Sequence, residues 1–307
     1  MPAWTASDIP DLTGRTAVVT GANSGLGLET TRELARKGAR VVMACRSEDR
    51  GRRARAEVVR EIPDANLDVE ILDLASLDSV RQFADERAPG RIDLLYCNAG
   101  VMAIPRSETA DGFETQFGVN VLGHFALAGR LLDPLLATDG SRVVWLSSMA
   151  AWGGSIHFGD LQGQRKYGRW RAYNQSKLAD LMLGLDMNRR LQDAGASTVS
   201  LAAHPGLSNT NLQTTSADQS DAGIEKAFYG LTMDRIAMTA AQGALPQLRA
   251  GTDPLARGGA FYGPAHGFRG RPVEVNPPKA ALAARTRARL WSACEQLTGV
   301  SFLPDGG

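Results

Sequence analysis

The chain has 307 residues, of which 43% are hydrophobic and 22% are charged, and its 34 Lys and Arg residues nearly balance its 33 Asp and Glu residues. Disordered proteins combine low hydrophobicity with high charge, so this composition predicts a globular fold with a substantial core. A net charge of +1 supplies no overall field for nucleic acid or for an anionic membrane surface. We therefore expect no nucleic-acid partner.

Residues 1–12 lack the basic and then apolar pattern of a signal peptide, and no apolar run approaches the ~18 residues of a membrane-spanning helix. The three cysteines, Cys45, Cys97 and Cys294, lie far apart, unlike those of a disulfide framework or a CxxC metal site. The four histidines show no HxxxH or HExxH spacing. These features predict a cytoplasmic protein without a membrane anchor and without a metal site.

The N-terminal part of the chain predicts a strand, a turn, a helix and a second strand. Residues 16–20 form a β-branched run that leads into a glycine-rich segment, and a helical pattern follows to Lys37. Gly38 ends this helix, and residues 40–44 supply the next apolar strand. Together they make a βαβ unit of about thirty residues.

The same alternation continues toward the C-terminus. Further strands are expected at residues 69–72, 94–97, 142–146, 198–202 and 260–262. Further helices are expected at residues 48–62, 77–87, 115–136, 172–191 and 235–248. Such alternation predicts an α/β fold with one doubly wound, mainly parallel sheet of about seven strands and helices on both faces.

Three later segments differ from this pattern. Residues 208–221 are polar and too long for an ordinary connection, which is typical of functional loops, so we assign residues 207–231 to a substrate loop. The Gly- and Pro-rich run 258–278 should end the sheet. A C-terminal helix is expected at 279–298, with a buried stripe of Leu282, Leu290, Ala293 and Leu297. We expect residues 1–307 to form one domain, with a core at about 16–264 and a C-terminal helix and tail at 279–307.

A glycine-rich turn joins the first strand to the first helix. Gly21, Gly25 and Gly27 follow the pattern TGxxxGxG, and a turn of this kind lets backbone N–H groups and the helix N-terminus meet a phosphate without a Cβ in the way. The strand, helix and second strand around it make a dinucleotide site the favoured interpretation. The other residues of the turn that we assign to the cofactor site are Asn23, Ser24 and Leu26.

Arg46 follows the second strand, where dinucleotide folds often place an acid that binds the ribose 2′-hydroxyl. An arginine cannot accept that hydrogen bond but can pair with a 2′-phosphate, so NADP(H) is the preferred cofactor and NAD(H) the alternative. Asp73 and Leu74, after the third strand, could border the adenine, although an aspartate there could instead cap a turn.

Tyr173 and Lys177 stand four residues apart on an expected helix, so both side chains lie on one face. A free phenol has a pKa near 10, and a nearby ammonium group lowers it toward the range useful for proton transfer. Such pairs also occur by chance. Ser148, just beyond an apolar strand, could polarise a substrate oxygen, and Asn120, in an apolar helix, could hold a water that relays protons or could mark a kink.

These motifs, taken in order, resemble those of the classical short-chain dehydrogenase/reductase family, and in particular its retinol-dehydrogenase-like branch. The resemblance spans about residues 16–264 and implies a Rossmann-type fold. It is carried by the glycine-rich turn, by the segment Cys97, Asn98, Ala99 and Gly100, by Asn120, Ser148, Tyr173 and Lys177, and by Pro205, Gly206 and Thr210. The branch is indicated by Ala44, Cys45 and Arg46, by residues 156–161, and by Leu290 and Trp291.

The resemblance implies a role for each of these residues. Tyr173 would be the acid/base, Ser148 its partner, Lys177 the ligand of the nicotinamide ribose, and Asn120 the fourth member of a tetrad. Asn98, Ala99, Gly100, Pro205, Gly206 and Thr210 would contact the cofactor. Cys97 departs from the asparagine that is common in the family. Animal retinol dehydrogenases have a membrane anchor and we expect none here, so retinoid substrates do not follow from the resemblance.

The sequence thus predicts an NADP(H)-dependent oxidoreductase that moves a hydride between the nicotinamide and a secondary alcohol or carbonyl carbon of a small, apolar molecule. The alternative is a non-catalytic NADP(H) sensor or an interaction protein on the same fold. The complete set of proton-transfer residues argues against a sensor, which has no use for a tuned phenol. Relatives in the family are often dimers or tetramers, so a homodimer or homotetramer is compatible with this interpretation.

Overall fold

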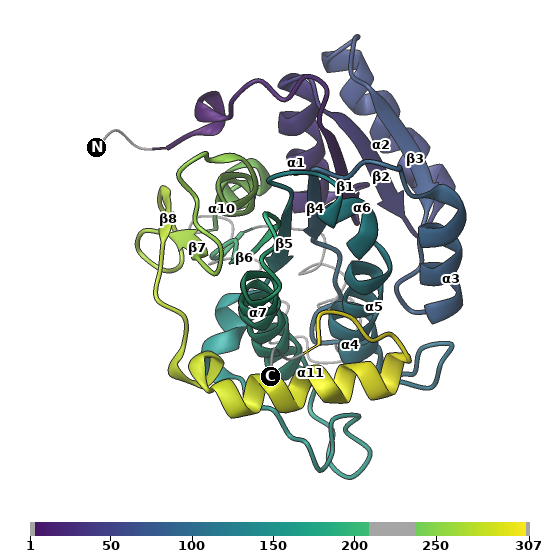
Figure 1. The fold of residues 1–307 in the computed structure, drawn as a ribbon, viewed down its shortest axis with the longest axis vertical. Coiled ribbons are helices and arrows are strands. Elements are labelled where there is room, and N and C mark those ends of the chain that lie inside the picture. Colours follow the sequence, from purple (N-terminus) through teal and green to yellow (C-terminus); the bar gives the residue numbers. More distant parts are fainter. Residues whose placement is uncertain (1–3, 209–236, 305–307) are drawn as a thin grey trace, which may run out of the picture.

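The computed structural model describes residues 4–208 and 237–304. Their centre is an eight-stranded sheet in the order β3-β2-β1-β4-β5-β6-β7-β8, with helices on both faces (Figure 1). The strands are β1 Thr16–Thr20, β2 Arg40–Cys45, β3 Leu67–Ile71, β4 Leu94–Cys97, β5 Arg142–Leu146, β6 Val199–Ala203, β7 Phe261–Pro264 and β8 Pro272–Glu274. All neighbours pair in parallel except β7 and β8, which pair antiparallel.

The described helices follow the expected alternation. They are α1 Gly25–Arg36, α2 Glu48–Glu61, α3 Leu77–Gln82, α4 Thr115–Phe117, α5 Gly123–Arg130, α6 Leu132–Leu136, α7 Arg169–Asp193, α10 Ala240–Thr252 and α11 Ala284–Thr298. From β1 the sheet grows in two directions, through β2 and β3 to one edge and through β4 and the later strands to the other. Open α/β sheets bind ligands in the crevice that forms where the strand order reverses in this way.

Local sequence signals account for several element ends. The five residues of β1 are all buried, as expected for a strand that is covered on both faces. Gly38, with a φ of +85°, adopts the left-handed conformation just after α1. The Ser47 hydroxyl accepts a hydrogen bond from the backbone N–H of Arg50 at the start of α2, and Ser76 caps α3 in the same way through Ser79.

The sheet has one strand more than expected. The Gly- and Pro-rich segment after β7 does not end the sheet but returns as β8, whose Val273 pairs with Gly263. This strand has three residues, includes a proline and is antiparallel at the sheet edge, so it carries little of the apolar periodicity from which buried strands are recognised.

The helices expected at residues 115–136 and 279–298 are both interrupted. The first is divided by the π-helical turn Gly118–Leu122 and by a break at Leu131. In the second, Ala283 is extended between a short 3-10 turn and α11, so Leu282 lies off the helix stripe and is 54% exposed instead of buried. Residues 83–87 are likewise a π-helical turn that follows α3.

Two hydrophobic cores lie on the two faces of the sheet. Alternate residues of each strand point to opposite faces, so Val18 contributes to one core and Val19 to the other. The core under α1, α2 and α10 contains Leu34 and Leu248. The larger core, under α3, α5 and α7, also receives Trp291 of α11.

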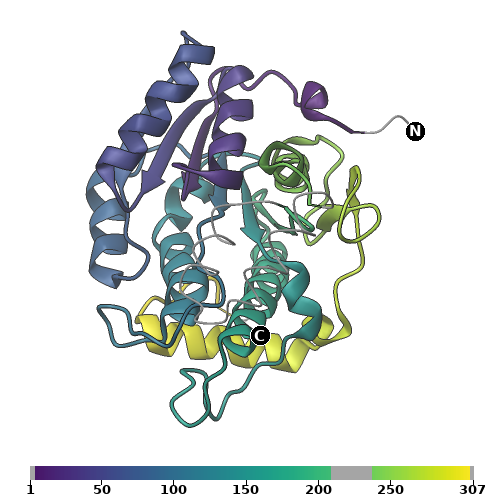
Figure 2. The ribbon, with the colours of Figure 1, turned by 180° about the vertical axis from the view of Figure 1, so that it is seen from behind.

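Helix α11 runs across α5 and α7 on the second face (Figures 1 and 2, yellow). The rings of Trp291 and Phe125 meet edge to face with their centroids 5.0 Å apart. The Arg190 guanidinium lies 4.4 Å from the Trp291 ring centroid and donates a hydrogen bond of 2.7 Å to the Leu303 carbonyl. The C-terminal segment is therefore fixed to α5 and α7 by both apolar and polar contacts.

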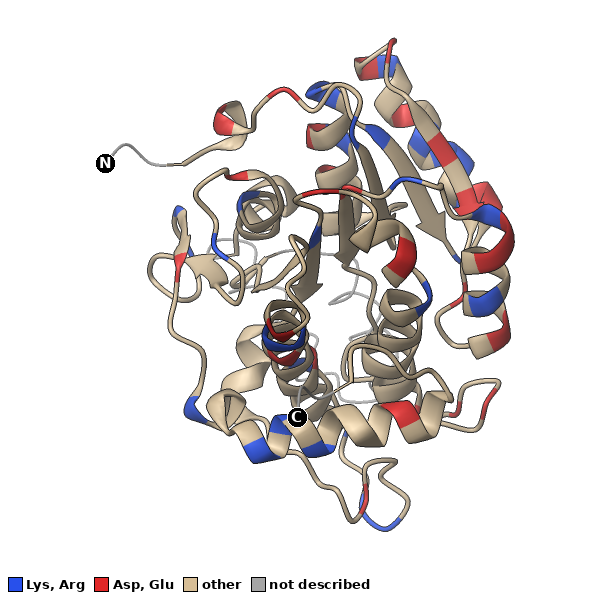
Figure 3. Ribbon diagram, viewed as in Figure 1, with Lys and Arg blue, Asp and Glu red and all other residues tan. Residues whose placement is uncertain are grey.

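Charged side chains of both signs mix on the outer helices α2 and α3, whereas the strands carry few (Figure 3). This distribution agrees with the near-zero net charge. Within the described residues, none of the helices combines the length and the apolar character that crossing a bilayer requires.

Candidate active site

A cavity of about 710 Å³ opens at the carboxyl ends of the central strands. It is bounded by the glycine-rich turn, by the start of α2 and by the segment that follows β4. The lining residues include Gly21, Asn23, Ser24, Gly25, Leu26, Gly27, Arg46, Ser47, Arg50, Arg53, Asn98, Ala99, Gly100, Val101, Met102, Ile104 and Leu146. All the residues predicted for the glycine-rich turn, Arg46 and the segment 98–100 are thus brought together around one cavity.

The glycine-rich turn has a geometry that side chains would not allow. Gly21 and Gly25 have positive φ angles of 66° and 54°. A Cβ on Gly27 would lie 2.4 Å from the Gly21 carbonyl oxygen and 2.6 Å from the Asn98 amide nitrogen. The turn can therefore fold tightly against the segment after β4 and leave its backbone open to a ligand, as phosphate binding requires.

Three arginines line the cavity where the second strand ends. Arg46 is exposed and follows β2, and Arg50 and Arg53 extend from the first turns of α2. Residues three or four positions apart lie on the same face of a helix, so Arg50 and Arg53 face the cavity together. From the sequence we assign only Arg46 to this position; the three-residue spacing of Arg50 and Arg53 along α2 is the signal that could have identified them. The group suits a ligand with a phosphate beyond the pyrophosphate.

Thr20 holds the segment after β4 against β1. Its hydroxyl oxygen accepts hydrogen bonds of 2.9 Å from the backbone N–H groups of Asn98 and Ala99, and the Asn98 amide donates to the Thr20 carbonyl at 2.8 Å. The side-chain amide of Gln247, on α10, donates a hydrogen bond of 3.1 Å to the side-chain oxygen of Asn98. Gln247 is 149 residues away from Asn98, so no local pattern indicates this contact.

Asn120 lies in the π-helical turn Gly118–Leu122 and is fully buried. Its amide oxygen accepts from the Val101 N–H at 2.8 Å, and its amide nitrogen donates to the Val101 carbonyl and to the Ser176 hydroxyl. The side chain thus fixes the cavity wall at Val101. The sequence leaves open whether Asn120 marks a helix kink or serves the site. In the structure it does both, because it lies in an irregular turn and bonds to Val101 in the cavity wall.

His124, one turn after Asn120, joins that residue to the first strand. Its Nδ1 lies 2.8 Å from the Asn120 carbonyl oxygen, which can only accept, so Nδ1 carries the proton. Its Nε2 lies 2.9 Å from the Thr20 hydroxyl. Burial lowers the pKa of His124 from 6.5 to about 4, and Lys177 adds to the effect, so the ring is neutral at physiological pH.

The two serines after β5 have different environments. The Ser147 hydroxyl is buried and donates a 2.7 Å hydrogen bond to the Lys177 carbonyl. Ser148 is partly exposed, begins the 3-10 turn Met149–Gly153 and accepts from the Ala150 N–H at 3.2 Å. The hydroxyl at the carboxyl edge of the sheet is therefore that of Ser148, the serine we selected from the sequence.

Tyr173 and Lys177 lie on one face of α7, and both are buried. The Lys177 ammonium donates hydrogen bonds to the Leu146 carbonyl at 2.9 Å and to the Asp180 carboxylate at 2.8 Å. Burial lowers the pKa of Lys177. The neighbouring Asp180 and Tyr173 raise it by more, so the pKa of Lys177 lies above its usual value. Among the described residues, the Tyr173 hydroxyl has no hydrogen-bond partner.

Several residues assigned to the cofactor do not line the cavity. Asp73 accepts a hydrogen bond from the Ala75 N–H at 3.0 Å, as in a capped turn, and Leu74 packs against Gly123. Pro205 and Gly206 lie after β6, where Gly206 has a φ of +67°. Thr210 and most of the predicted substrate loop lie outside the described residues.

Exposed apolar side chains gather near the proton-transfer residues. Met149 follows Ser148 and is 39% exposed, and Trp170, also 39% exposed, meets the Tyr173 ring edge-on at 6.1 Å. Trp152 is 48% exposed and stacks on Phe261 with ring centroids 5.7 Å apart. Large apolar side chains are rarely exposed together without a function, so these residues are candidates for a substrate surface.

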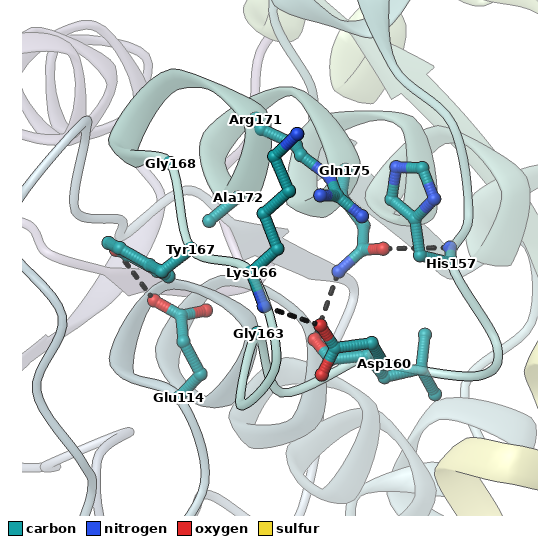
Figure 4. A pocket seen from close by; sticks show the side chains of 11 residues that line it. Glu114, His157, Asp160, Gly163, Lys166, Tyr167, Gly168, Arg171, Ala172 and Gln175 are labelled. Carbon is teal, nitrogen blue, oxygen red and sulfur yellow. Dashed lines mark hydrogen bonds between the residues drawn. The ribbon is translucent and has the colours of Figure 1, made fainter.

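A second, small pocket lies beside the N-terminus of α7, and hydrogen bonds among the residues around it hold this part of the chain (Figure 4). The buried Glu114 carboxylate accepts a 3.2 Å hydrogen bond from the Tyr167 hydroxyl, and burial raises the pKa of Glu114. The Asp160 carboxylate accepts hydrogen bonds from the backbone N–H groups of Gln164 and Lys166. This network fixes the segment that enters α7 and thereby the position of Tyr173.

Burial disfavours the thiolate form of the three cysteines. Burial raises the pKa of Cys45 to about 12 and places the pKa of Cys97 well above its usual value. In the parts of the chain that the structure describes, His, Cys, Asp and Glu form no cluster suited to a metal ion.

Comparison with known proteins gives matches at two levels. A family model described as short chain dehydrogenase matches residues 15–221. Retinol dehydrogenase 13 of Homo sapiens is 46% identical over 202 residues, which cover 65% of this chain and 60% of that protein. Retinol dehydrogenase 11 of Mus musculus is 44% identical over 203 residues, covering 66% and 64%. The match therefore spans less than two thirds of the length of these relatives.

Solved structures extend the similarity to nearly the whole chain. An uncharacterised protein from Mycobacterium paratuberculosis is 42% identical with a TM-score of 0.82, covering 98% of this chain and 99% of that one. A short chain dehydrogenase from Shigella flexneri, complexed with NADP, has a TM-score of 0.63 over 82% of this chain and 98% of that one. Its sequence identity is 23%, so this second likeness is one of fold alone.

Proposed function

Because the chain belongs to the short chain dehydrogenase family, we propose that it is an NADP(H)-dependent oxidoreductase that interconverts a secondary alcohol and a carbonyl compound. The resemblance inferred from its motifs is confirmed by the family match and by the retinol dehydrogenase relatives. The single observation that best supports the cofactor is the cavity in which the glycine-rich turn and three arginines face one another.

The lining residues fit a phosphorylated dinucleotide. The backbone of Gly21–Gly27 would hold the pyrophosphate at the N-terminus of α1, and Arg46 would pair with the 2′-phosphate, with Arg50 beside it. When bound, the nicotinamide supplies or receives the hydride. The residues after β4, Asn98 to Gly100, would form the wall on which it rests.

Tyr173, Ser148 and Lys177 would have different roles in the proton transfer. In the reducing direction, the Tyr173 hydroxyl would donate its proton to the carbonyl oxygen, while the Ser148 hydroxyl would donate a hydrogen bond to the same oxygen. The buried Lys177 ammonium would stabilise the negative charge left on the phenol oxygen. In the oxidising direction the same groups would act in reverse.

We propose an apolar substrate that carries a ring. Met149, Trp152 and Trp170 expose apolar surface beside Ser148 and Tyr173, and flat rings pack well on indole faces. The names of the relatives state retinol as the substrate of those proteins. A retinoid therefore belongs in a substrate panel, although the exposed apolar side chains would accept other ring-bearing molecules equally well.

A panel of ring-bearing and open-chain ketones, aldehydes and alcohols, with retinoid and steroid members, tests this proposal. We expect NADPH-dependent reduction, followed by absorbance at 340 nm, to be fastest for apolar ring-bearing carbonyl compounds. Tyr173→Phe serves as the matched control because it keeps the ring and removes the proton.

The outcome also separates the enzyme from a cofactor sensor. A sensor would bind NADPH tightly but turn over none of these compounds. Turnover that is equal in the parent protein and in Tyr173→Phe would contradict the proposed chemistry, since the reduction would then not depend on this proton donor.

A further inference from the structure

Asp180 forms a buried ion pair with Lys177 that the proposed mechanism does not require. The two residues are three positions apart on α7, and their side chains are 3% and 6% exposed. The Lys177 ammonium has three N–H donors, of which one bonds to Asp180 and one to the Leu146 carbonyl. Leu146 lines the cofactor cavity, so the third donor is the one left for a ligand or for Tyr173.

In the part of the chain that the structure describes, the Asp180 carboxylate forms hydrogen bonds to Lys177 alone. Its Oδ2 accepts the hydrogen bond, and within the described residues its Oδ1 is buried without any hydrogen-bond partner. A buried ion pair of this kind contributes little net stability, because the desolvation of both charges offsets their attraction. Stability therefore gives no sufficient reason for an acid at this position.

Other ionisable groups packed around the pair are neutral near pH 7. Burial raises the pKa of Cys97, on β4, and of Cys294, on α11, and lowers the pKa of His124, on α5, to about 4. Burial also raises the pKa of Asp180 itself to about 6, partly offset by Lys177. Above that pH, Lys177 and Asp180 are therefore the charged members of this group of buried residues.

We propose that Asp180 is a positioning residue that holds the Lys177 ammonium against Leu146 and, through its charge, sets the pH at which the Tyr173–Lys177 pair loses its first proton. The inference rests on the proposed function. A negative charge close to two interacting groups raises the macroscopic pKa values of both, so its removal makes the first proton leave at a lower pH.

Asp180→Asn tests the charge while preserving the size and the acceptor oxygen of the side chain. We expect the pH profile of kcat/KM for alcohol oxidation to move to lower pH by about half a unit or more. The change in NADP affinity should stay within about threefold, because the hydrogen bond to Lys177 remains. Asp180→Leu, which removes the acceptor as well, should in addition weaken NADP binding.

Asp186→Asn is the matched control on the same helix. Asp186 is also buried, forms ion pairs with Arg190 at 2.9 Å and with Arg189 at 3.2 Å, and lies about two and a half turns of α7 from Lys177. Its neutralisation removes a buried negative charge of the same kind but should leave the pH profile in place. A general loss of stability would appear in both variants, whereas the shift should appear only in Asp180→Asn.

A measurement without substrate keeps the test independent of the proposed activity. Tyrosinate absorbance is titrated in each protein with and without Tyr173→Phe, and the difference reports Tyr173 alone. The midpoint should lie at lower pH in Asp180→Asn than in the parent chain. An unchanged or higher midpoint, in protein whose fold is intact by circular dichroism, would overturn the inference. Failure of the proposed function alone would instead appear as absent turnover with the midpoint shifted.

Discussion

The two ends of the candidate site are built in different ways. At the nucleotide end, the backbone of the glycine-rich turn and exposed arginines line the cavity. At the proton-transfer end, Asn120, His124 and Lys177 are buried and bonded to β1, to β5 and to the segment after β4. One end presents charges to solvent, and the other encloses them.

This difference predicts how the two ends respond to substitution. Exposed charges interact through water, so their contributions to binding should be nearly additive and should be small unless the charge pairs directly with the ligand. Buried groups that share hydrogen bonds should be coupled, and the loss of one should affect the others. The following experiments test this contrast in order of expected effect.

Tyr173→Phe should have the largest effect. The variant keeps the buried ring and removes the transferable proton, so kcat should fall by about a hundredfold or more, as is typical of a lost general acid. NADPH affinity, measured by fluorescence titration, should remain close to that of the parent chain. Near-parental turnover would exclude Tyr173 from proton transfer.

Arg46→Asp should change the cofactor preference. The loss of a charge-assisted pair should weaken NADPH binding by about ten- to a hundredfold, and the new carboxylate should favour NADH. Dissociation constants for both cofactors at fixed ionic strength provide the measurement. Equal affinity of the parent protein for NADH and NADPH would show that Arg46 does not recognise the 2′-phosphate.

His124 should make folding sensitive to acid. Its pKa is lowered to about 4 in the folded protein, so the stability that its neutral ring contributes is present above pH 6.5 and is lost as the pH falls toward 4. By pH 5 the loss should reach about 2 kcal/mol. Urea unfolding at pH 7.5 and 5.0 measures it.

His124→Gln should reduce this pH dependence, and His266→Gln, at an exposed position, should not. His204, whose pKa burial also lowers to about 4, remains in both variants and accounts for a residual slope. A slope that is the same in all three proteins would mean that His124 is not responsible.

Arg50→Ala should have the smallest effect. Arg50 is exposed at the cavity, and exposed charge contacts are worth little, so NADPH affinity should fall by about two- to fivefold. Arg52→Ala is the control, because Arg52 lies on the same helix, pairs with Glu48 and does not line the cavity. Equal losses in the two variants would indicate a general effect of charge.

Much of the fold could be predicted because its signals are local. The first βαβ unit, the glycine-rich turn and the order of the buried strands follow from apolar runs separated by Gly, Pro and Ser. The short edge strand β8 and the break at Ala283 were missed, since neither interrupts an apolar period. The π-helical turn at Gly118–Leu122 was missed because its sequence remains helical in pattern.

Sequence by itself determined which chemistry this chain can offer. Gly21 to Gly27, Ser148, Tyr173 and Lys177 are candidates because each has a fixed place relative to a strand end or a helix face, and such places are set by spacing along the chain. The motif order also identified the family, which the comparisons confirm.

Tertiary structure alone decided the partners of these groups. Gln247 reaches Asn98 from 149 residues away, and His124 connects Asn120 to Thr20 across the sheet. Even Asp180, three residues from Lys177, becomes its counter-ion only because packing excludes water from both side chains. The strength of such contacts depends on burial, and burial is a property of the folded chain.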